Sequence, residues 1–179
     1  MIYEPREDSF LMEKVVKKYA YGKVLDMGTG SGIQAIAAAK NKKVKSVIAV
    51  DINKEAVMDT LQNAMKEGIP ISVQQSNLFG NIDEKFDTII FNPPYLPRDP
   101  KLKDLTLDGG EKGYELIQRF LKQANKYLEN DGIILLLFSS LTDKDKVEEI
   151  LTKNKYEYKE VDKLNLDFEE LYIYSIKCK

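Results

Sequence analysis

A turn built on three alternating glycines separates a short, mostly apolar segment from an alanine-rich one. Lys23 to Met27 has the length and composition of a buried strand, and Ile33 to Lys40 those of a helix. Gly28, Gly30 and Gly32 stand between them. Glycine there permits a tight turn and lets a ligand approach the main chain closely. The sequence therefore predicts a strand, a turn and a helix in direct succession, which is the repeating unit of α/β domains.

Strands and helices alternate along the rest of the 179-residue chain. Asn53 can cap a helix whose apolar residues, Leu61 and Met65 among them, recur at helical spacing and which stops at Gly68. Ile133 to Phe138 is apolar throughout, as expected of a strand covered on both faces. Further strands are expected at Val44–Val50, Ile71–Gln75, Phe86–Phe91, Tyr156–Leu164 and Glu169–Ile176, and further helices at Tyr114–Leu128 and Asp143–Lys153, with a turn at 130–132. This order predicts one α/β domain over residues 1–179, with a doubly wound, mostly parallel sheet of seven strands.

The composition argues against several kinds of chemistry. The chain has no histidine, which disfavours Ser-His hydrolases and most zinc enzymes. Its single cysteine, Cys178, allows neither an internal disulfide nor a cysteine metal cluster. The 27 basic and 29 acidic residues argue against a protein whose affinity rests mainly on neutralising phosphates. Without an apolar run of about 20 residues or a signal-like N-terminus, a cytoplasmic protein with no membrane association is expected.

Residues that follow the expected strands indicate a cofactor with a nucleoside part. Asp51 ends the second strand, where a carboxylate can accept hydrogen bonds from two ribose hydroxyls, although a strand-end or capping role is the alternative. Asn77 and Leu78, after the third strand, are placed to contact an adenine edge, although Asn also ends strands for local backbone reasons. A dinucleotide fingerprint needs glycine where the chain has Ile33, and a P-loop needs Lys and then Ser or Thr after Gly32. The pattern therefore points away from nicotinamide and flavin cofactors.

The loop after the fourth strand, Asn92-Pro93-Pro94-Tyr95, has the chemistry of an NH₂-binding site. Two prolines hold the backbone extended and present carbonyl oxygens as acceptors beside the Asn92 side chain. Such a loop can bind both hydrogens of an amide or amine nitrogen. A rigid exit from the strand is the alternative, but the carboxyl ends of the strands are where ligands bind in this class of fold.

Together, the turn from Asp26 to Gly32, the acid Asp51 and the Asn92–Tyr95 loop resemble the class I S-adenosylmethionine-dependent N-methyltransferases. The segments Tyr3–Leu11 and Asp108–Gly113 are similar to the compact archaeal and eukaryotic branch of the HemK/PrmC glutamine methyltransferases. The resemblance implies S-adenosyl-L-methionine as cofactor. It implies cofactor contacts at Ser9, Asp26, Gly28, Gly30, Gly32, Asp51, Asn77, Leu78 and Asn92, and a substrate site of Asn92, Pro93 and Tyr95.

The resemblance also implies a substrate and a partner. In that branch the substrate is the glutamine of the Gly-Gly-Gln motif of a class I release factor, and a small zinc-binding activator protein assists. The family more often has Asp at position 77 and Thr at position 9, and this chain keeps a hydrogen-bonding group at both. One alternative is an adenine-amino DNA or RNA methyltransferase, because the same loop suits the amine of a flipped base. Another is an inactive binding subunit, against which the intact Asn92 argues.

Two segments are expected to serve partners. Pro70 to Gln75 is predicted to be an exposed edge strand whose outward apolar residues the activator covers. The long connection from Tyr95 to Gly113 is expected to bind substrate, with Gly109 and Gly110 as a hinge. A disordered connection without function is the alternative for the second segment.

Overall fold

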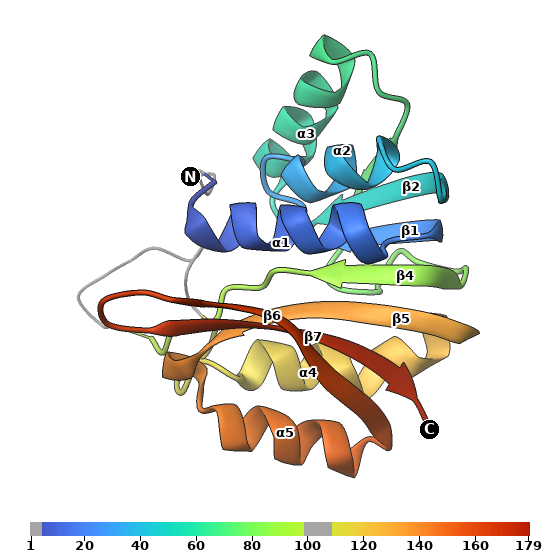
Figure 1. Cartoon of the computed structure of the whole chain (residues 1–179). Helices are drawn as coiled ribbons and strands as arrows, with labels where there is room; N and C mark the ends of the chain where they lie inside the picture. The colour runs from blue at the N-terminus through green and yellow to red at the C-terminus, as the bar shows by residue number, and fades with distance from the viewer. Residues whose placement is uncertain (1–4, 99–108) are drawn as a thin grey trace.

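A computed structural model describes residues 5–98 and 109–179. The start of the Tyr3–Leu11 segment and the centre of the predicted substrate loop lie outside these ranges. The described chain forms a seven-stranded sheet between two layers of helices (Figure 1). The strands are β1 (Gly22–Met27), β2 (Val44–Asp51), β3 (Ser72–Gln75), β4 (Phe86–Phe91), β5 (Leu128–Ser139), β6 (Tyr156–Asn165) and β7 (Glu170–Cys178). The predicted doubly wound, mostly parallel sheet of seven strands is confirmed.

The strand order, β3-β2-β1-β4-β5-β7-β6, places a topological switch between β1 and β4. The chain leaves β1 toward β2 and β3, then returns to the other side of β1 as β4. These strands and β5 are parallel and closely in register: Met27 pairs with both Val50 and Phe91, and Asp51 pairs with Gln75. The loops that follow these strands therefore emerge at one level along one edge, where open α/β sheets bind ligands.

Helices cover both faces of the sheet because successive strand residues point to opposite sides. On one face, Val24 and Leu135 pack with side chains of α1 (Glu7–Tyr19) and α2 (Ile33–Ala39). On the other, their neighbours Leu25 and Leu136 pack with α4 (Glu115–Ala124) and α5 (Lys144–Lys153). The first helix was not predicted, although Leu11, Met12, Val15 and Val16 recur at helical spacing and are buried.

The helix α3 (Lys54–Lys66) begins where predicted, because the Asn53 side chain accepts a hydrogen bond from the Glu55 N–H. The residues of its predicted apolar pattern divide between the core and the surface. The buried residues are Ala56, Thr60 and Ala64, whereas Leu61 and Met65 are exposed. The small residues allow α3 to pack closely beside the glycine turn, and the larger apolar side chains are left on the surface.

The predicted helix at Tyr114–Leu128 ends earlier than expected. After α4 a short 3-10 turn, η1 (Asn125–Tyr127), leads directly into β5 at Leu128, which pairs with Phe86. The next registered pair joins Thr88 to Ile133, so β5 accommodates extra residues within the ladder. The predicted turn at 130–132 therefore lies inside β5, at an irregularity of the strand where the pairing with β4 shifts register.

The last two strands form an antiparallel hairpin at the far side of the sheet. Ser139, near the end of β5, pairs with Leu171 of β7, and Asn165 of β6 pairs with Glu170. The β6–β7 turn therefore reaches the same edge as the loops after β1, β2 and β4 (Figure 1). Within residues 5–98 and 109–179, no helix has the length and apolar character needed to cross a bilayer.

Candidate active site

The glycine turn after β1 has an open side and a packed side. Gly28, Gly30 and Gly32 have φ values of 67°, 56° and 85°, which L side chains rarely adopt. A Cβ at Gly30 would meet no atom within 4 Å, so the backbone is accessible there. A Cβ at Gly32 would lie 2.9 Å from the Thr60 methyl, so that glycine serves the close packing of α3. The turn thus exposes its main chain at Gly28 and Gly30.

Asp26 organises this turn from below. Its side chain is almost wholly buried and accepts hydrogen bonds from the Thr29 hydroxyl at 2.7 Å and the Ala35 N–H at 3.1 Å. Burial raises the pKa of this carboxyl to about 7, and the two hydrogen bonds only partly oppose that effect. Asp26 therefore joins the glycine turn to the start of α2.

Asp51 links the end of β2 to the glycine turn. One carboxylate oxygen accepts the Gly30 N–H at 3.0 Å and the other accepts the Asn53 N–H at 2.8 Å. The residue is only partly buried, and each oxygen has a further lone pair for a ligand. Asp51 is therefore fixed in position and still able to accept hydrogen bonds.

The turn after β3 is held by a residue that the sequence prediction missed. The buried Ser76 donates its hydroxyl to the Leu78 carbonyl at 2.7 Å, and its N–H donates to the Asp51 carbonyl at 2.8 Å. Leu78 has a φ of 50°, an unusual value for a residue with a side chain and one often found at functional sites. Asn77 is exposed beside it. The predicted adenine-contact residues thus lie on a constrained turn next to Asp51.

Asn92, directly after β4, combines a satisfied donor with an unsatisfied acceptor. Its Nδ2 donates to an Asp8 carboxylate oxygen at 2.9 Å. Its Oδ1 is buried and has no hydrogen-bond partner within the described part of the chain. Leaving a buried acceptor unpaired costs about 1–3 kcal/mol. A bound ligand that donates a hydrogen bond to Asn92 Oδ1 would remove this cost.

The remainder of the Asn92–Tyr95 loop is immobilised from several sides. Pro93 is buried, and the Tyr95 ring belongs to the apolar cluster beneath α1. The Tyr95 carbonyl accepts the Thr142 hydroxyl at 2.9 Å. Tyr95 is therefore mainly a core residue with little surface for the substrate contact that the sequence suggested.

The two ends of the long connection are joined at its base. The Gly109 N–H donates to the Leu96 carbonyl, and the Arg98 N–H to the Gly110 carbonyl, both at 2.9 Å. A Cβ on Gly109 would lie 2.3 Å from the Gly113 carbonyl oxygen and 2.8 Å from that of Pro94. Gly109 is thus needed for close backbone packing against the Asn92–Tyr95 loop.

The first turn of α1 closes the site from the N-terminal side. Ser9 is buried, and its carbonyl accepts the Gln34 side-chain N–H at 2.9 Å, which fixes α1 to α2. Asp8, the partner of Asn92, is in the same turn. Ser9 and Asn92, which are far apart in the sequence, are thereby brought close together.

These residues fit S-adenosylmethionine. The uncovered main chain at Gly28 and Gly30 leaves space for a ligand, and Asp51 offers acceptors for a ribose diol. The exposed Asn77 offers polar contacts for an adenine. Among residues 5–98 and 109–179, no group of three or more acidic, Cys or His side chains is arranged to hold a metal ion.

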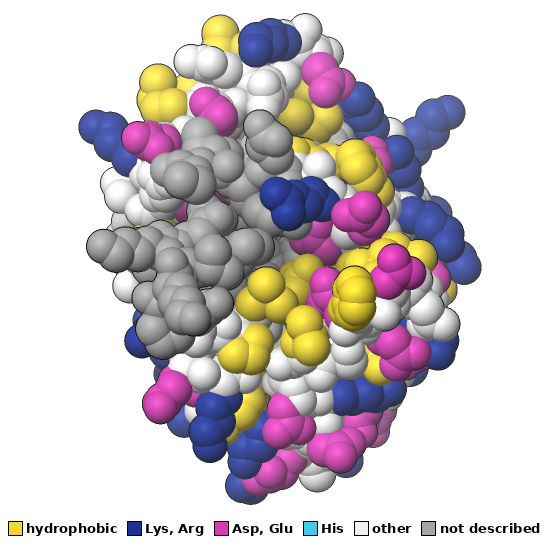
Figure 2. Space-filling view, turned by 90° about the vertical axis from the view of Figure 1, so that its left-hand side faces the viewer, with side chains coloured by type: hydrophobic (Ala, Val, Ile, Leu, Met, Phe, Trp, Pro, Cys, Tyr) yellow, Lys and Arg dark blue, Asp and Glu magenta, His cyan; other side chains and the backbone are white. Residues whose placement is uncertain are grey.

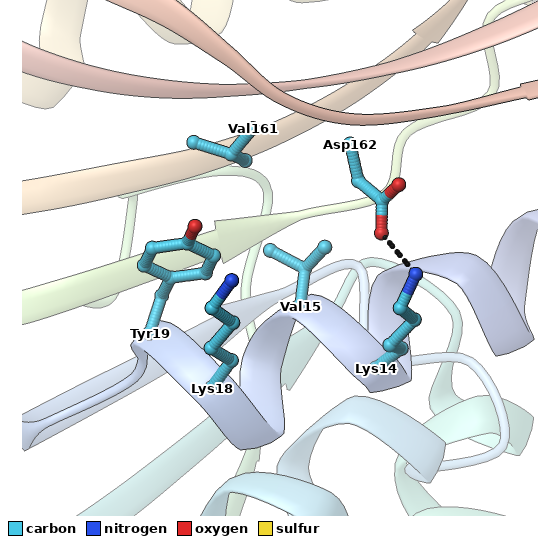
Figure 3. Close-up of a pocket in the computed structure, with 6 residues that line it drawn as sticks. All are labelled: Lys14, Val15, Lys18, Tyr19, Val161 and Asp162. Carbon is cyan, nitrogen blue, oxygen red and sulfur yellow. Dashed lines mark ion pairs between the residues drawn. The ribbon is translucent and has the colours of Figure 1, made fainter.

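A separate small pocket lies between the later part of α1 and β6. It has a volume of about 230 Å³, and the Lys14–Asp162 ion pair of 2.7 Å closes one side (Figure 3). Val15, Lys18, Tyr19 and Val161 form the remaining wall. None of these residues belongs to the loops after β1, β2, β3 or β4, so the pocket is distinct from the candidate site.

The strand order and the loops at the β1–β4 switch define a class I methyltransferase. The chain belongs to the methyltransferase small domain family, which matches residues 7–165. A Methanocaldococcus jannaschii protein, named provisionally as a protein N5-glutamine methyltransferase, is 38% identical over 177 residues, covering 96% of this chain and 89% of its own length. The release factor glutamine methyltransferase of Streptococcus pneumoniae is 37% identical over 123 residues, covering 63% of this chain and 44% of its own. The chain thus spans nearly all of the archaeal relative and less than half of this bacterial one.

Solved structures agree on the fold. A ribosomal protein L11 methylase from Lactobacillus delbrueckii has a TM-score of 0.74 at 25% identity, covering 98% of this chain and 82% of its own. The Encephalitozoon cuniculi Mtq2–Trm112 complex, described as methylating the eRF1 termination factor, contains a chain with a TM-score of 0.78 at 24% identity and 99% coverage of both chains. The predicted methyltransferase class is confirmed.

Proposed function

We propose that this methyltransferase uses S-adenosylmethionine to methylate the amide nitrogen of a glutamine in the Gly-Gly-Gln motif of a class I release factor. The observation that carries the proposal is the buried, unpaired Asn92 Oδ1 at the carboxyl end of β4. The names of the archaeal and bacterial relatives support the choice of glutamine and of release factor.

The cofactor supplies, when bound, a methyl group on a positively charged sulfur. Gly28, Gly30 and Asp51 would hold it, with Asn77, Leu78 and Ser9 at its margins. Asp26 supports the turn from within, and Gly32 serves its packing.

The protein must make a poor nucleophile reactive, because an amide nitrogen shares its lone pair with the carbonyl. Asn92 Oδ1 accepts one N–H of the substrate amide, and the Pro93 carbonyl accepts the other. Two acceptors so placed favour a tetrahedral nitrogen, whose lone pair is then free for bond formation. After transfer the nitrogen is cationic, and it releases a proton to water without a strong base. A chain without histidine can therefore perform this chemistry.

The rim of the site suits a polypeptide. Exposed hydrophobic side chains stand on three separate elements at this edge: Phe10 of α1, Leu141 after β5 and Phe168 in the β6–β7 turn, the last 95% exposed. Figure 2 shows this side of the molecule, with hydrophobic, acidic and basic side chains close together near its centre. Such a mixed surface favours a protein over a polyanionic nucleic acid.

A small zinc-binding protein is proposed as partner at the opposite margin of the sheet. Within the described chain β3 pairs only with β2, and its outward residues are polar, contrary to the expectation of apolar ones. Exposed apolar side chains are instead supplied by Ile52 and by Met58, Leu61 and Met65 of α3. The Mtq2–Trm112 complex supports a small partner protein.

The test is mass spectrometry of a purified class I release factor after incubation with the protein and cofactor, with and without a candidate activator. One added methyl group on the glutamine of the Gly-Gly-Gln peptide is expected, and Asn92→Ala serves as the inactive control. Methyl transfer to adenine in DNA or RNA, with the release factor unmodified, would refute the proposal.

A further inference from the structure

We infer that Asp8 is a positioning residue, which fixes the amide of Asn92 with its oxygen facing the substrate. This inference rests on the proposed function, because it takes Asn92 Oδ1 to accept a hydrogen bond from the substrate nitrogen that receives the methyl group. Its starting point is the 2.9 Å hydrogen bond from Asn92 Nδ2 to Asp8, together with the unpaired Oδ1 on the same amide.

An asparagine amide has two ends of nearly equal shape and opposite hydrogen-bonding character. If Asn92 turned its amide over, it would present a donor in place of an acceptor and could no longer accept a substrate N–H. The Asn92 backbone does not decide between the two orientations. A neighbouring group that only accepts hydrogen bonds does decide.

An ionised carboxylate is such a group, because all of its lone pairs are acceptors. With Asp8 beside it, the overturned amide would place Oδ1 against a negatively charged oxygen and lose a charge-assisted hydrogen bond. Since Asp8 is only 4% exposed, water cannot readily replace that bond. The acceptor therefore remains directed at the site before substrate arrives.

Asp8 is itself held by the fold. It lies in the first turn of α1, which the Ser9–Gln34 hydrogen bond attaches to α2. The aspartate and the asparagine are 84 residues apart in sequence and come from different layers. A segment N-terminal to the sheet thereby controls a side chain at the end of β4.

The test is a double-mutant cycle in single-turnover methylation of the release factor. Asp8→Ala is expected to slow methyl transfer about tenfold to a hundredfold, while cofactor affinity changes less than about twofold. In the Asn92→Ala background the same substitution is expected to have no further effect, because its target is gone. Asp8→Asn, which preserves volume, provides the same comparison if the alanine variant does not fold.

Reciprocal exchange gives a sharper test. Asn92→Asp alone places two carboxyl groups together and is expected to be nearly inactive. Adding Asp8→Asn restores one donor and one acceptor across the pair, so the double variant is expected to recover at least about tenfold over Asn92→Asp. A purely structural role of Asp8 would give no such recovery.

Glu7→Ala is the matched control, since Glu7 is an exposed acid in the same helical turn. NMR of isotope-labelled protein without substrate gives an independent readout: the Asn92 NH₂ signals should be protected from exchange in the wild type and lose protection in Asp8→Ala. Additive rate effects and unchanged protection would overturn the role of Asp8. A wild-type protein that leaves the release factor unmodified would overturn the proposed function instead.

Discussion

The Gly30 N–H donates to the Asp51 carboxylate at 3.0 Å, so the turn after β1 is joined directly to the end of β2. The same carboxylate accepts the Asn53 N–H, which starts α3. Asp51 thus shapes the proposed cofactor site even before it contacts a ligand.

Asp51→Ala should weaken binding of S-adenosylmethionine by about 1.5–3 kcal/mol, roughly tenfold to a few hundredfold, because charge-assisted hydrogen bonds are lost. Calorimetric titration measures the change. Asp59→Ala on α3 is the control for removal of an acid nearby. An unchanged dissociation constant in a folded Asp51→Ala protein would reduce Asp51 to a strand-end residue.

Asn92→Ala should lower the single-turnover rate on the order of a hundredfold to a thousandfold, because the acceptor acts chiefly on the tetrahedral nitrogen. Cofactor affinity should change far less, which titration on the same preparation will show. If the variant methylates at the wild-type rate, binding of the amide by Asn92 is wrong.

Asp26 should make stability depend on pH. Its pKa is raised from 3.8 to about 7 in the folded protein, so between these values the folded state binds the extra proton. The stability that this extra proton contributes to the folded state is fully present below pH 3.8 and is lost as the pH rises through about 7. Asp26→Asn cannot ionise, so its unfolding free energy relative to wild type should increase from about pH 4 to about pH 7 and stay level above that. Parallel urea-unfolding profiles for the two proteins would contradict the role of burial.

Gly109→Ala should distort the Asn92–Tyr95 loop, because the new Cβ meets carbonyl oxygens of the backbone on two sides. We expect a loss of stability of about 1–3 kcal/mol and a lower methylation rate. Gly80→Ala is the milder comparison, since its Cβ would meet one backbone oxygen at 3.2 Å, which a shift of a few tenths of an ångström relieves, and its φ is not positive. Thermal unfolding and single-turnover rates report the two effects, and equal behaviour of both variants would refute the packing role.

Met58→Lys combined with Met65→Lys should weaken binding of the activator about tenfold or more, because both side chains are exposed beside the edge strand. Phe168→Lys, in the β6–β7 turn, should leave the affinity for the activator unchanged. Co-purification and titration with the activator distinguish these outcomes. If the double variant binds as the wild type does, the partner uses another surface.

The sequence predicts the strands well because their signals are local. Phe86–Phe91 is recovered to the residue, and the Asn53 cap marks the start of α3 as expected. The helix α1 was not predicted, although its apolar residues recur at helical spacing. The exposed face of α3 could not be read, since Leu61 and Met65 fit a helical stripe and only the contact of Thr60 with Gly32 shows which side is buried.

The site was predictable as a set of residue types and not as a set of roles. Asn92 and Asp51 follow from chemistry at strand ends. Asp26 holds the glycine turn through buried hydrogen bonds, and Ser76 holds the turn after β3. These roles could not be predicted, because hydrogen-bond partners depend on distances in the folded protein that sequence spacing does not provide. Asp8 is the clearest case, since its partner lies 84 residues away.

The pairing of Met27 with Phe91 has a consequence for how such a protein can diversify. The residues proposed to hold the methyl donor follow β1, and those proposed to hold the acceptor follow β4, so their separation is tied to the spacing of two adjacent strands, about 4.8 Å. Changes in the loops at the rim of the site can then alter which molecule is modified, while the distance between methyl donor and acceptor stays the same. New specificities can arise at the rim without rebuilding the chemistry beneath it.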